Sequence, residues 1–153
     1  MKRISQIGSL LKRIYRIYSG ELLLILQNKG FTDLRPSFLE VLLAICEKDG
    51  PSIKEIGLAC GLKKQTMTSH LNELENRGYI SRTINPYDKR EQNIHLTEYG
   101  QRFKFALNES INQLEQEYSM LLGEVELERF EHLLTSVHTK MTASQKNELP
   151  LEH

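Results

Sequence analysis

Two short stretches of the chain carry side chains suited to binding a polyanion. In the first, Lys63, Lys64 and Gln65 precede the hydroxyl-rich run Thr66-Met67-Thr68-Ser69. In the second, Asp88-Lys89-Arg90 lies in the middle of a polar segment. Amide, hydroxyl and basic groups form hydrogen bonds with base edges and phosphates, so both stretches are candidates for contact with nucleic acid.

The distribution of charge supports this interpretation, although the net charge of the 153 residues is zero. Residues 1–35 hold seven basic and two acidic side chains, and residues 54–104 hold nine and six. Residues 105–150 hold three basic and eight acidic side chains. An excess of basic residues in the first two ranges and of acidic residues in the last is typical of a protein with one face toward a polyanion. An ordinary solvated surface accounts for the same distribution.

Hydrophobic periodicity predicts the elements that position these side chains. Apolar residues recur at helical spacing in about residues 4–29, 36–48, 52–60, 64–77, 98–120 and 124–143. Between Tyr79 and Leu96 the pattern alternates around a polar centre, which predicts two short strands joined by a long charged loop. We therefore expect a mainly α (α+β) fold of six helices and one small antiparallel hairpin.

Local signals mark the turn before the hydroxyl-rich helix. Ser52 and Glu55 have the spacing of a capping box, which predicts a helix start. Gly61 is expected to permit the turn into the next helix, and Gly57 to let the two helices cross closely. Two helices across a tight turn, followed by a hairpin, have the order of a winged helix-turn-helix, whose second helix enters a major groove.

At this point the chain resembles the MarR family (multiple antibiotic resistance regulators). The resemblance rests on five pieces in the family's order: Glu55-Ile56-Gly57 through Gly61-Leu62, Thr66-Met67-Thr68, Leu74 through Arg82, Asp88-Lys89-Arg90, and Leu96-Thr97-Glu98-Tyr99-Gly100. It covers roughly residues 52–100 and implies a homodimeric transcriptional regulator that binds a pseudo-palindromic operator. Repression, and release by a small aromatic or phenolic effector, are further expectations of the resemblance.

The resemblance also implies roles for individual residues. The recognition helix would contact double-stranded DNA through Lys63, Lys64, Gln65, Thr66, Thr68 and Ser69. In the wing, Arg90 would enter the minor groove, Asp88 would brace the loop by pairing with a nearby basic side chain, and Lys89 would contact phosphate. Arg77 and Arg82 would contact phosphates too. Lys63 departs from the family, because a capping Ser, Thr or Asp usually stands there and lysine caps poorly.

The outer helices carry apolar stripes that one small lobe would leave uncovered. We expect residues 4–29 and 105–143 to form the homodimer interface, with a monomer's own core as the alternative. Its expected members are Ile7, Leu11, Ile14, Phe130, Leu133 and Val137. Tyr15, Arg16, Tyr18 and Phe38 are candidates for an effector crevice beside it, although simple packing accounts for these aromatic residues as well.

Other kinds of site find little support in the sequence. His70 and His95 are expected to be structural, and no metal or cofactor is expected. Cys46 and Cys60 fall on predicted buried faces, with redox sensing as a minority hypothesis. There is no phosphate-binding glycine loop or catalytic triad, so an enzyme is not expected.

We expect a cytoplasmic protein without a membrane span, and a single domain over residues 1–150, with the winged lobe at about 36–104. Residues 151–153 look like the remnant of an expression tag. The alternative function is a winged-helix module that binds protein and not DNA.

Overall fold

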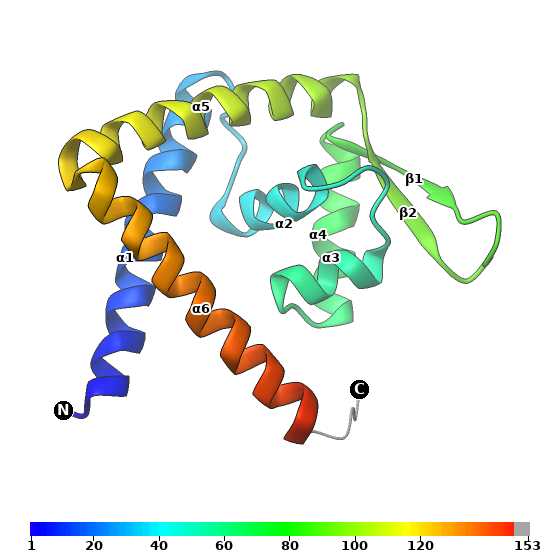
Figure 1. The fold of residues 1–153 in the computed structure, drawn as a ribbon. Helices are drawn as coiled ribbons and strands as arrows, with labels where there is room; N and C mark the ends of the chain where they lie inside the picture. The colour runs from blue at the N-terminus through cyan, green and yellow to red at the C-terminus, as the bar shows by residue number, and fades with distance from the viewer. Residues whose placement is uncertain (149–153) are drawn as a thin grey trace. The chain divides into compact units, whose positions relative to one another are not determined.

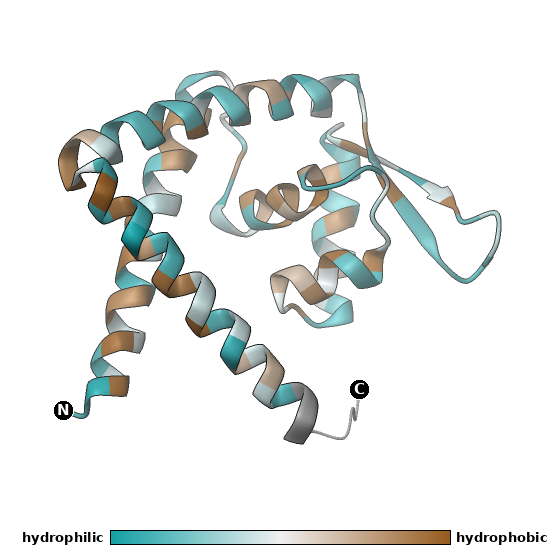
Figure 2. Ribbon diagram, viewed as in Figure 1, coloured by the Kyte–Doolittle hydropathy of each residue, from teal (hydrophilic) through white to brown (hydrophobic). Residues whose placement is uncertain are grey.

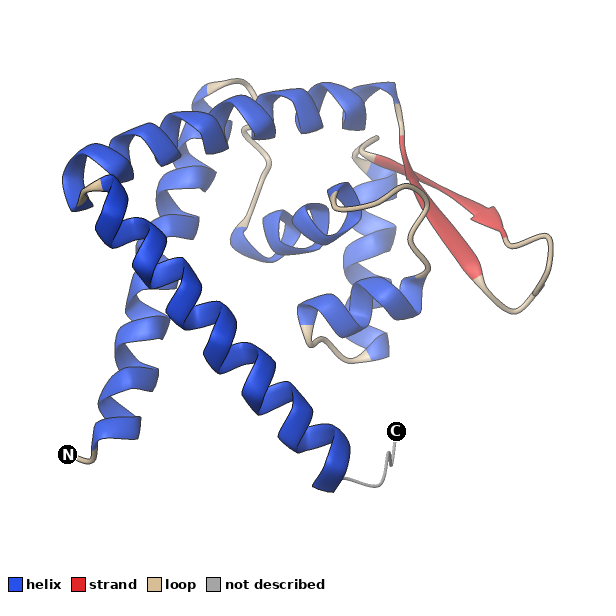
Figure 3. Cartoon of the chain, in the orientation of Figure 1, coloured by secondary structure: helices blue, strands red, loops and turns tan. Residues whose placement is uncertain are grey.

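A computed structural model of the protein describes residues 1–148 in backbone and residues 1–145 in side chain. The described elements are α1 (Arg3–Asn28), α2 (Pro36–Cys46), α3 (Ile53–Cys60), α4 (Lys64–Asn76), β1 (Ile80–Ile84), β2 (Gln92–Leu96), α5 (Glu98–Leu122) and α6 (Glu124–Glu148) (Figures 1 and 3). The expected fold of six helices and one antiparallel hairpin is thereby confirmed, with α6 a few residues longer than predicted. The expected tag remnant at residues 151–153 lies outside the described residues.

The chain divides into two compact units, Met1–Ile111 and Asn112–His153. The first holds α1 to α4, the hairpin and the first half of α5, and the second holds the end of α5 and α6. All residues predicted to contact DNA therefore belong to one unit.

The turn into α4 is made by the residues that predicted it. The Ser52 hydroxyl accepts a hydrogen bond from Glu55 N at 3.1 Å, and Glu55 Oε1 accepts one from Ser52 N at 3.2 Å, so the capping box is complete. Gly61 follows α3 in the left-handed region, at φ 65°. Because a side chain is disfavoured there, glycine allows α4 to start after a turn of only three residues, 61–63.

Gly57, in contrast, does not have the role expected of it. A Cβ at this position would lie 3.8 Å from the nearest neighbour, the Leu62 carbonyl oxygen, which is an ordinary contact. The close approach lies instead at Gly100 in α5, where a Cβ would lie 2.1 Å from the Tyr79 carbonyl oxygen. Glycine at residue 100 therefore lets α5 pack directly on the chain that enters β1.

The core of the first unit lies between the helices and the base of the hairpin. Leu22 and Leu26 of α1 are fully buried, as are Leu71 and Leu74 of α4. The aromatic rings of Phe31, Tyr79, Tyr99 and Phe103 pack together with centroids 4.9–6.3 Å apart. Edge and tilted contacts of this kind stabilise beyond the area they bury. This cluster fixes the start of α5 to the base of the hairpin.

The two strands pair in register from Ile80 opposite Leu96 to Ile84 opposite Gln92. At the base, Ile80 and Ile94 are buried, whereas Ile84 near the tip is exposed. The hairpin is therefore anchored at one end and projects from the rest of the unit at the other (Figure 1).

Candidate nucleic-acid interface

One face of α4 is buried and the opposite face is open to solvent. Met67, Leu71 and Leu74 pack into the core at helical spacing. The residues left on the open side at the start of the helix are Lys63, Lys64, Gln65, Thr66 and Ser69. The structure therefore brings these predicted contact residues together on one exposed surface.

Thr68 differs from the other hydroxyl residues of α4. It is half-buried, and its hydroxyl donates a hydrogen bond to the Lys64 carbonyl oxygen at 2.8 Å. Its only hydroxyl proton is therefore used within the helix, although its oxygen can still accept. Gln65, Thr66 and Ser69 consequently have more hydrogen-bonding capacity available for a ligand.

The first turn of α4 has no side-chain cap. Lys63 stands at the cap position with extended backbone, at φ −69° and ψ 152°, and its side chain makes no capping hydrogen bond. A helix start carries partial positive charge and backbone N–H groups without helical partners. This end of α4 is therefore suited to face an anion such as a phosphate.

The tip of the hairpin is held in shape by its own polar groups. Asn85 Oδ1 accepts a hydrogen bond from Tyr87 N at 2.9 Å, and Asn85 N donates to the Glu91 carbonyl oxygen at 2.9 Å. Asp88 Oδ1 accepts from Arg90 N at 3.0 Å and lies 3.4 Å from Arg90 Nε. Asp88 thus pairs with Arg90 itself, while the Arg90 side chain remains 93% exposed.

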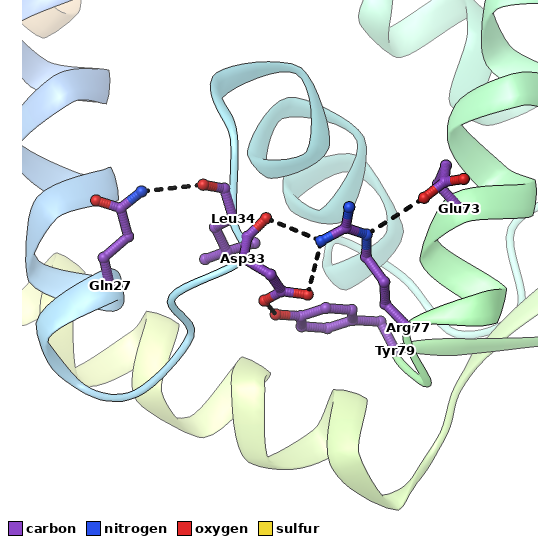
Figure 4. A network of polar contacts seen from close by, with 6 residues as sticks. All are labelled: Gln27, Asp33, Leu34, Glu73, Arg77 and Tyr79. Carbon is purple, nitrogen blue, oxygen red and sulfur yellow. Dashed lines mark hydrogen bonds and ion pairs between the residues drawn. The ribbon is translucent and has the colours of Figure 1, made fainter.

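The two arginines that were predicted to contact phosphates are paired within the protein. Arg77 Nη1 donates to Asp33 Oδ2 at 3.1 Å, and Arg77 Nε donates to Glu73 Oε2 at 3.4 Å (Figure 4). The hydrogen bond with Asp33 raises the pKa of Arg77 above its ordinary value. A phosphate contact through Nη1 or Nε would therefore require Arg77 to exchange these partners.

Arg82 joins the hairpin to α4. Its Nη2 donates to Asn72 Oδ1, and its Nε lies 3.5 Å from Glu75 Oε1, which makes an ion pair. The Arg82 side chain is only 16% exposed. Sequence reasoning missed these partners, because the carboxylate and the amide come from another element.

The predicted interface helices carry apolar residues that remain uncovered within one chain. On α1, Ile7, Leu11 and Ile14 are each about two-fifths exposed or more. On α6, Leu133 is 64% and Val137 is 44% exposed, and Phe130 is half-buried. Apolar residues recur along each of these two helices (Figure 2). Large exposed apolar patches of this kind mark interaction surfaces.

The candidate crevice residues occupy two different surroundings. Phe38 is 2% exposed and packs in the core, with the His70 ring edge-on at 5.7 Å. Tyr15 and Arg16 are exposed on α1, and the Tyr18 ring lies 6.2 Å from that of Tyr15. Partial burial, with Glu40 nearby, raises the pKa of the Tyr15 phenol. The packing explanation therefore holds for Phe38, and a ligand at the other three stays a prediction.

The thiols lie in half-buried positions. Burial raises the pKa of both Cys46 and Cys60 to about 11, although Lys104 acts in the opposite direction at Cys46. Cys60 Sγ also lies 3.7 Å from the Glu40 carbonyl oxygen. The thiolate is the reactive form of cysteine, so these surroundings oppose redox chemistry at neutral pH.

Neither a metal cluster nor a membrane span occurs within the described part of the chain. Its His, Cys, Asp and Glu side chains form no group of three that could hold a metal ion. None of its helices is long and apolar enough to cross a membrane. His95 contacts a hydroxyl, with Nε2 lying 3.0 Å from Thr83 Oγ1.

Comparison with known proteins points to one family. Residues 32–91 match a model described as the MarR family. The transcriptional regulator SarZ of Staphylococcus saprophyticus is 36% identical over 84 residues, which cover 55% of this chain and 58% of that protein. The chain spans about half the length of the curated relatives it matches.

Solved structures extend the similarity to most of the chain. A MarR family transcriptional regulator from Rhodococcus sp. RHA1 superposes with a TM-score of 0.72 at 25% identity, covering 90% of this chain and 95% of that one. The transcriptional repressor CouR, solved with a 23-mer DNA duplex, superposes with a TM-score of 0.73 at 24% identity and covers 90% and 96%. Because CouR is only 24% identical to this chain, its similarity establishes the fold alone.

Proposed function

We propose that this chain is a member of the MarR family and a sequence-specific DNA-binding transcriptional regulator. The observation that carries the proposal is the pair of exposed polar surfaces in the first unit. One is the start of α4 with Gln65, Thr66 and Ser69, and the other is the hairpin tip with Arg90. Both project hydrogen-bonding groups that are not saturated by the protein itself.

Each surface suits a different part of the double helix. An α-helix fits the major groove, where Gln65 can pair with an adenine through two hydrogen bonds. A narrow minor groove concentrates negative potential, which favours the guanidinium of Arg90 there. Lys63, Lys64 and Lys89 would then contact flanking phosphates, which fix position without reading sequence.

We further propose that the protein binds DNA as a homodimer through α1 and α6. The support is the exposed apolar stripe on each of these helices. A dimer with twofold symmetry requires an operator with two inverted half-sites, about one helical turn or 34–36 Å apart. The bound dimer would exclude polymerase from a promoter, so repression in the cytoplasm is the expected outcome.

Release by a small aromatic or phenolic effector is part of the same proposal. Tyr15, Arg16 and Tyr18 on α1 offer two aromatic rings and one cation, a combination that suits an aromatic acid. We propose no catalytic activity and no cofactor for the chain.

The test of DNA binding is fluorescence anisotropy with duplexes tiled across the region upstream of the protein's own gene, over a salt series. The expected result is one inverted repeat that binds far more tightly than the others, with affinity falling steeply as salt rises. If no duplex binds at low salt, the proposal fails and a protein partner for the winged lobe becomes the leading alternative.

The dimer has its own test by light scattering after size exclusion. Ile14→Glu and Leu133→Glu each place a charge within an apolar stripe and should yield monomers. Leu58→Glu is a matched control, because Leu58 is 76% exposed on α3 and outside both stripes. A dimeric Ile14→Glu variant would contradict the assignment of α1 to the interface.

A further inference from the structure

Asp33 occupies a junction between three parts of the first unit. It lies in the loop between α1 and α2, and both of its carboxylate oxygens accept hydrogen bonds (Figure 4). Oδ2 accepts from Arg77 Nη1 at 3.1 Å, and Oδ1 accepts from the Tyr79 hydroxyl at 2.9 Å. The carbonyl oxygen of Asp33 also lies 3.3 Å from Arg77 Nη1. One loop residue thus holds the end of α4 and the residue before β1.

The same loop is attached to α1. Gln27 Nε2 of α1 donates a hydrogen bond to the Leu34 carbonyl oxygen at 2.9 Å (Figure 4). Phe31 N donates to the Leu26 carbonyl oxygen at 3.2 Å, and the Phe31 ring packs edge-on to Phe103 at 5.4 Å. A continuous set of contacts therefore runs from α1 through the loop to the last turn of α4.

Arg77 is confined on more than one side. Besides Asp33 and Glu73, its guanidinium lies 5.1 Å from the centre of the Phe38 ring, and the guanidinium of Arg35 lies 4.6 Å from the same centre. The side chains of Asp33 and Arg77 are 35% and 26% exposed, so water screens their attraction less than at an open surface. These are the surroundings of a positioning residue.

We propose that Asp33, acting through Arg77 and Tyr79, determines how well the protein discriminates its operator from other DNA. The proposal rests on the proposed function. α1 is the helix proposed to hold the two subunits together, and α4 is the helix proposed to read bases. The contact from α1 to α4 therefore sets where each reading helix lies relative to the dimer. Sequence discrimination depends on that placement, whereas non-specific attraction to phosphates does not.

Asp33→Asn separates this role from a direct phosphate contact by the sign of its effect. Asparagine keeps the size of the side chain and removes the charge that holds Arg77. If Asp33 is a positioning residue, Asp33→Asn should weaken operator binding about tenfold or more and leave affinity for a scrambled duplex unchanged. If Arg77 instead binds phosphate, its release should strengthen binding to both duplexes, and that result would overturn the proposal.

The salt dependence of Arg77→Gln gives a second, independent criterion. Removing one phosphate contact lowers the slope of log affinity against log salt by about 1. A positioning role predicts weaker operator binding with the slope unchanged. A lower slope for Arg77→Gln would contradict the proposal, and Arg90→Gln in the same assay shows what the loss of a cation that contacts DNA looks like.

A third measurement needs no DNA, so it separates failure of this inference from failure of the proposed function. Amide hydrogen exchange reports on Arg77 N, Gly78 N and Tyr79 N, which donate to carbonyl oxygens in the last turn of α4. In Asp33→Asn these amides should exchange about tenfold faster or more, while the buried amides of α2 do not change. Unchanged exchange at the end of α4 would overturn the proposal even if no operator were found.

Two control variants guard against a general loss of stability. Glu109→Gln removes the Lys29–Glu109 ion pair, at 3.7 Å in the same unit, and should leave operator discrimination intact. Tyr79→Phe removes one hydrogen bond to Asp33 and keeps the ring in the aromatic cluster, so it should lower discrimination less than Asp33→Asn does. Equal discrimination in Asp33→Asn, Tyr79→Phe and the unmodified protein would reject the assignment.

Discussion

Tyr79 and Tyr87 lie in the same short stretch of chain and have opposite surroundings. Tyr79, at the base of the hairpin, is fully buried, and its ring lies 4.9 Å from Tyr99 and 5.7 Å from Phe103. Tyr87, at the tip, is 97% exposed. The base of the hairpin is therefore part of the core, whereas the tip is open to solvent.

Two arginines repeat this contrast. Arg77, near the base, is paired with Asp33 and Glu73, whereas Arg90, at the tip, is paired with Asp88 of its own loop. A cation that its own protein already satisfies has little left for a ligand, and one that is 93% exposed has most of its donors available. Both arginines were predicted to contact DNA. The comparison favours Arg90 for that contact and supports the proposal that Arg77 has a positioning role.

The largest effect that separates the two ends concerns stability. Tyr79→Ala removes a fully buried aromatic ring and its hydrogen bond, and should lower the free energy of unfolding by about 3–5 kcal/mol. Tyr87→Ala should change it by less than about 0.5 kcal/mol. Urea unfolding followed by circular dichroism measures both, and similar values for the two variants would contradict the division between base and tip.

At the tip, the larger effect should appear in DNA binding. Arg90→Ala should weaken operator binding by about 10- to 100-fold, because a good base contact contributes about 1–3 kcal/mol. Stability and dimer formation should not change, since the side chain is 93% exposed and pairs with Asp88 of its own loop. Arg129→Ala is a matched control, because Arg129 is an exposed arginine of α6 that pairs with Glu126. Equal operator affinity for Arg90→Ala and the unmodified protein would remove the wing from the interface.

The sequence predicted what depends on neighbouring residues. Ser52 with Glu55, and Gly61 in its turn, act over a few positions, and the positions of α3 and α4 followed from them. The exposed face at the start of α4 followed as well, because the buried positions of α4 recur at helical spacing. No such signal reveals the partner of Arg77, because Asp33 is 44 positions away in the sequence. Basic residues near a DNA-binding motif look alike until their partners are known.

The two glycines illustrate the same lesson and give a smaller, two-sided test. Gly57→Ala has room for its Cβ and should stabilise the protein by up to about 1 kcal/mol, since alanine favours a helix. Gly100→Ala should destabilise it, because the added Cβ would overlap the Tyr79 carbonyl oxygen at the base of the hairpin. Opposite shifts in thermal midpoint are expected, and destabilisation by Gly57→Ala would restore the close helix crossing that the sequence suggested.

Oxidation of the two thiols should have the smallest effect on folding and on DNA binding at neutral pH. Burial raises the pKa of Cys46 and Cys60 from 9.0 to about 11, so the thiolate fraction at pH 8 is about 100-fold lower than for a free cysteine. Alkylation by iodoacetamide should be slower by a similar factor, and peroxide should leave operator binding unchanged. Tyr87→Cys, at the tip, should react at the ordinary rate.

The same pKa shift fixes the sign of a pH dependence. Above pH 9 the unfolded chain loses thiol protons that the folded protein retains, so the contribution to stability is complete below pH 9 and is lost as pH rises toward 11. Rapid alkylation of Cys60 at pH 8 would contradict the raised pKa of its thiol. Release of DNA on oxidation would in addition restore a redox role. A redox role would then belong to Cys60 in α3, outside the hairpin, where the thiol lies against the Glu40 carbonyl oxygen.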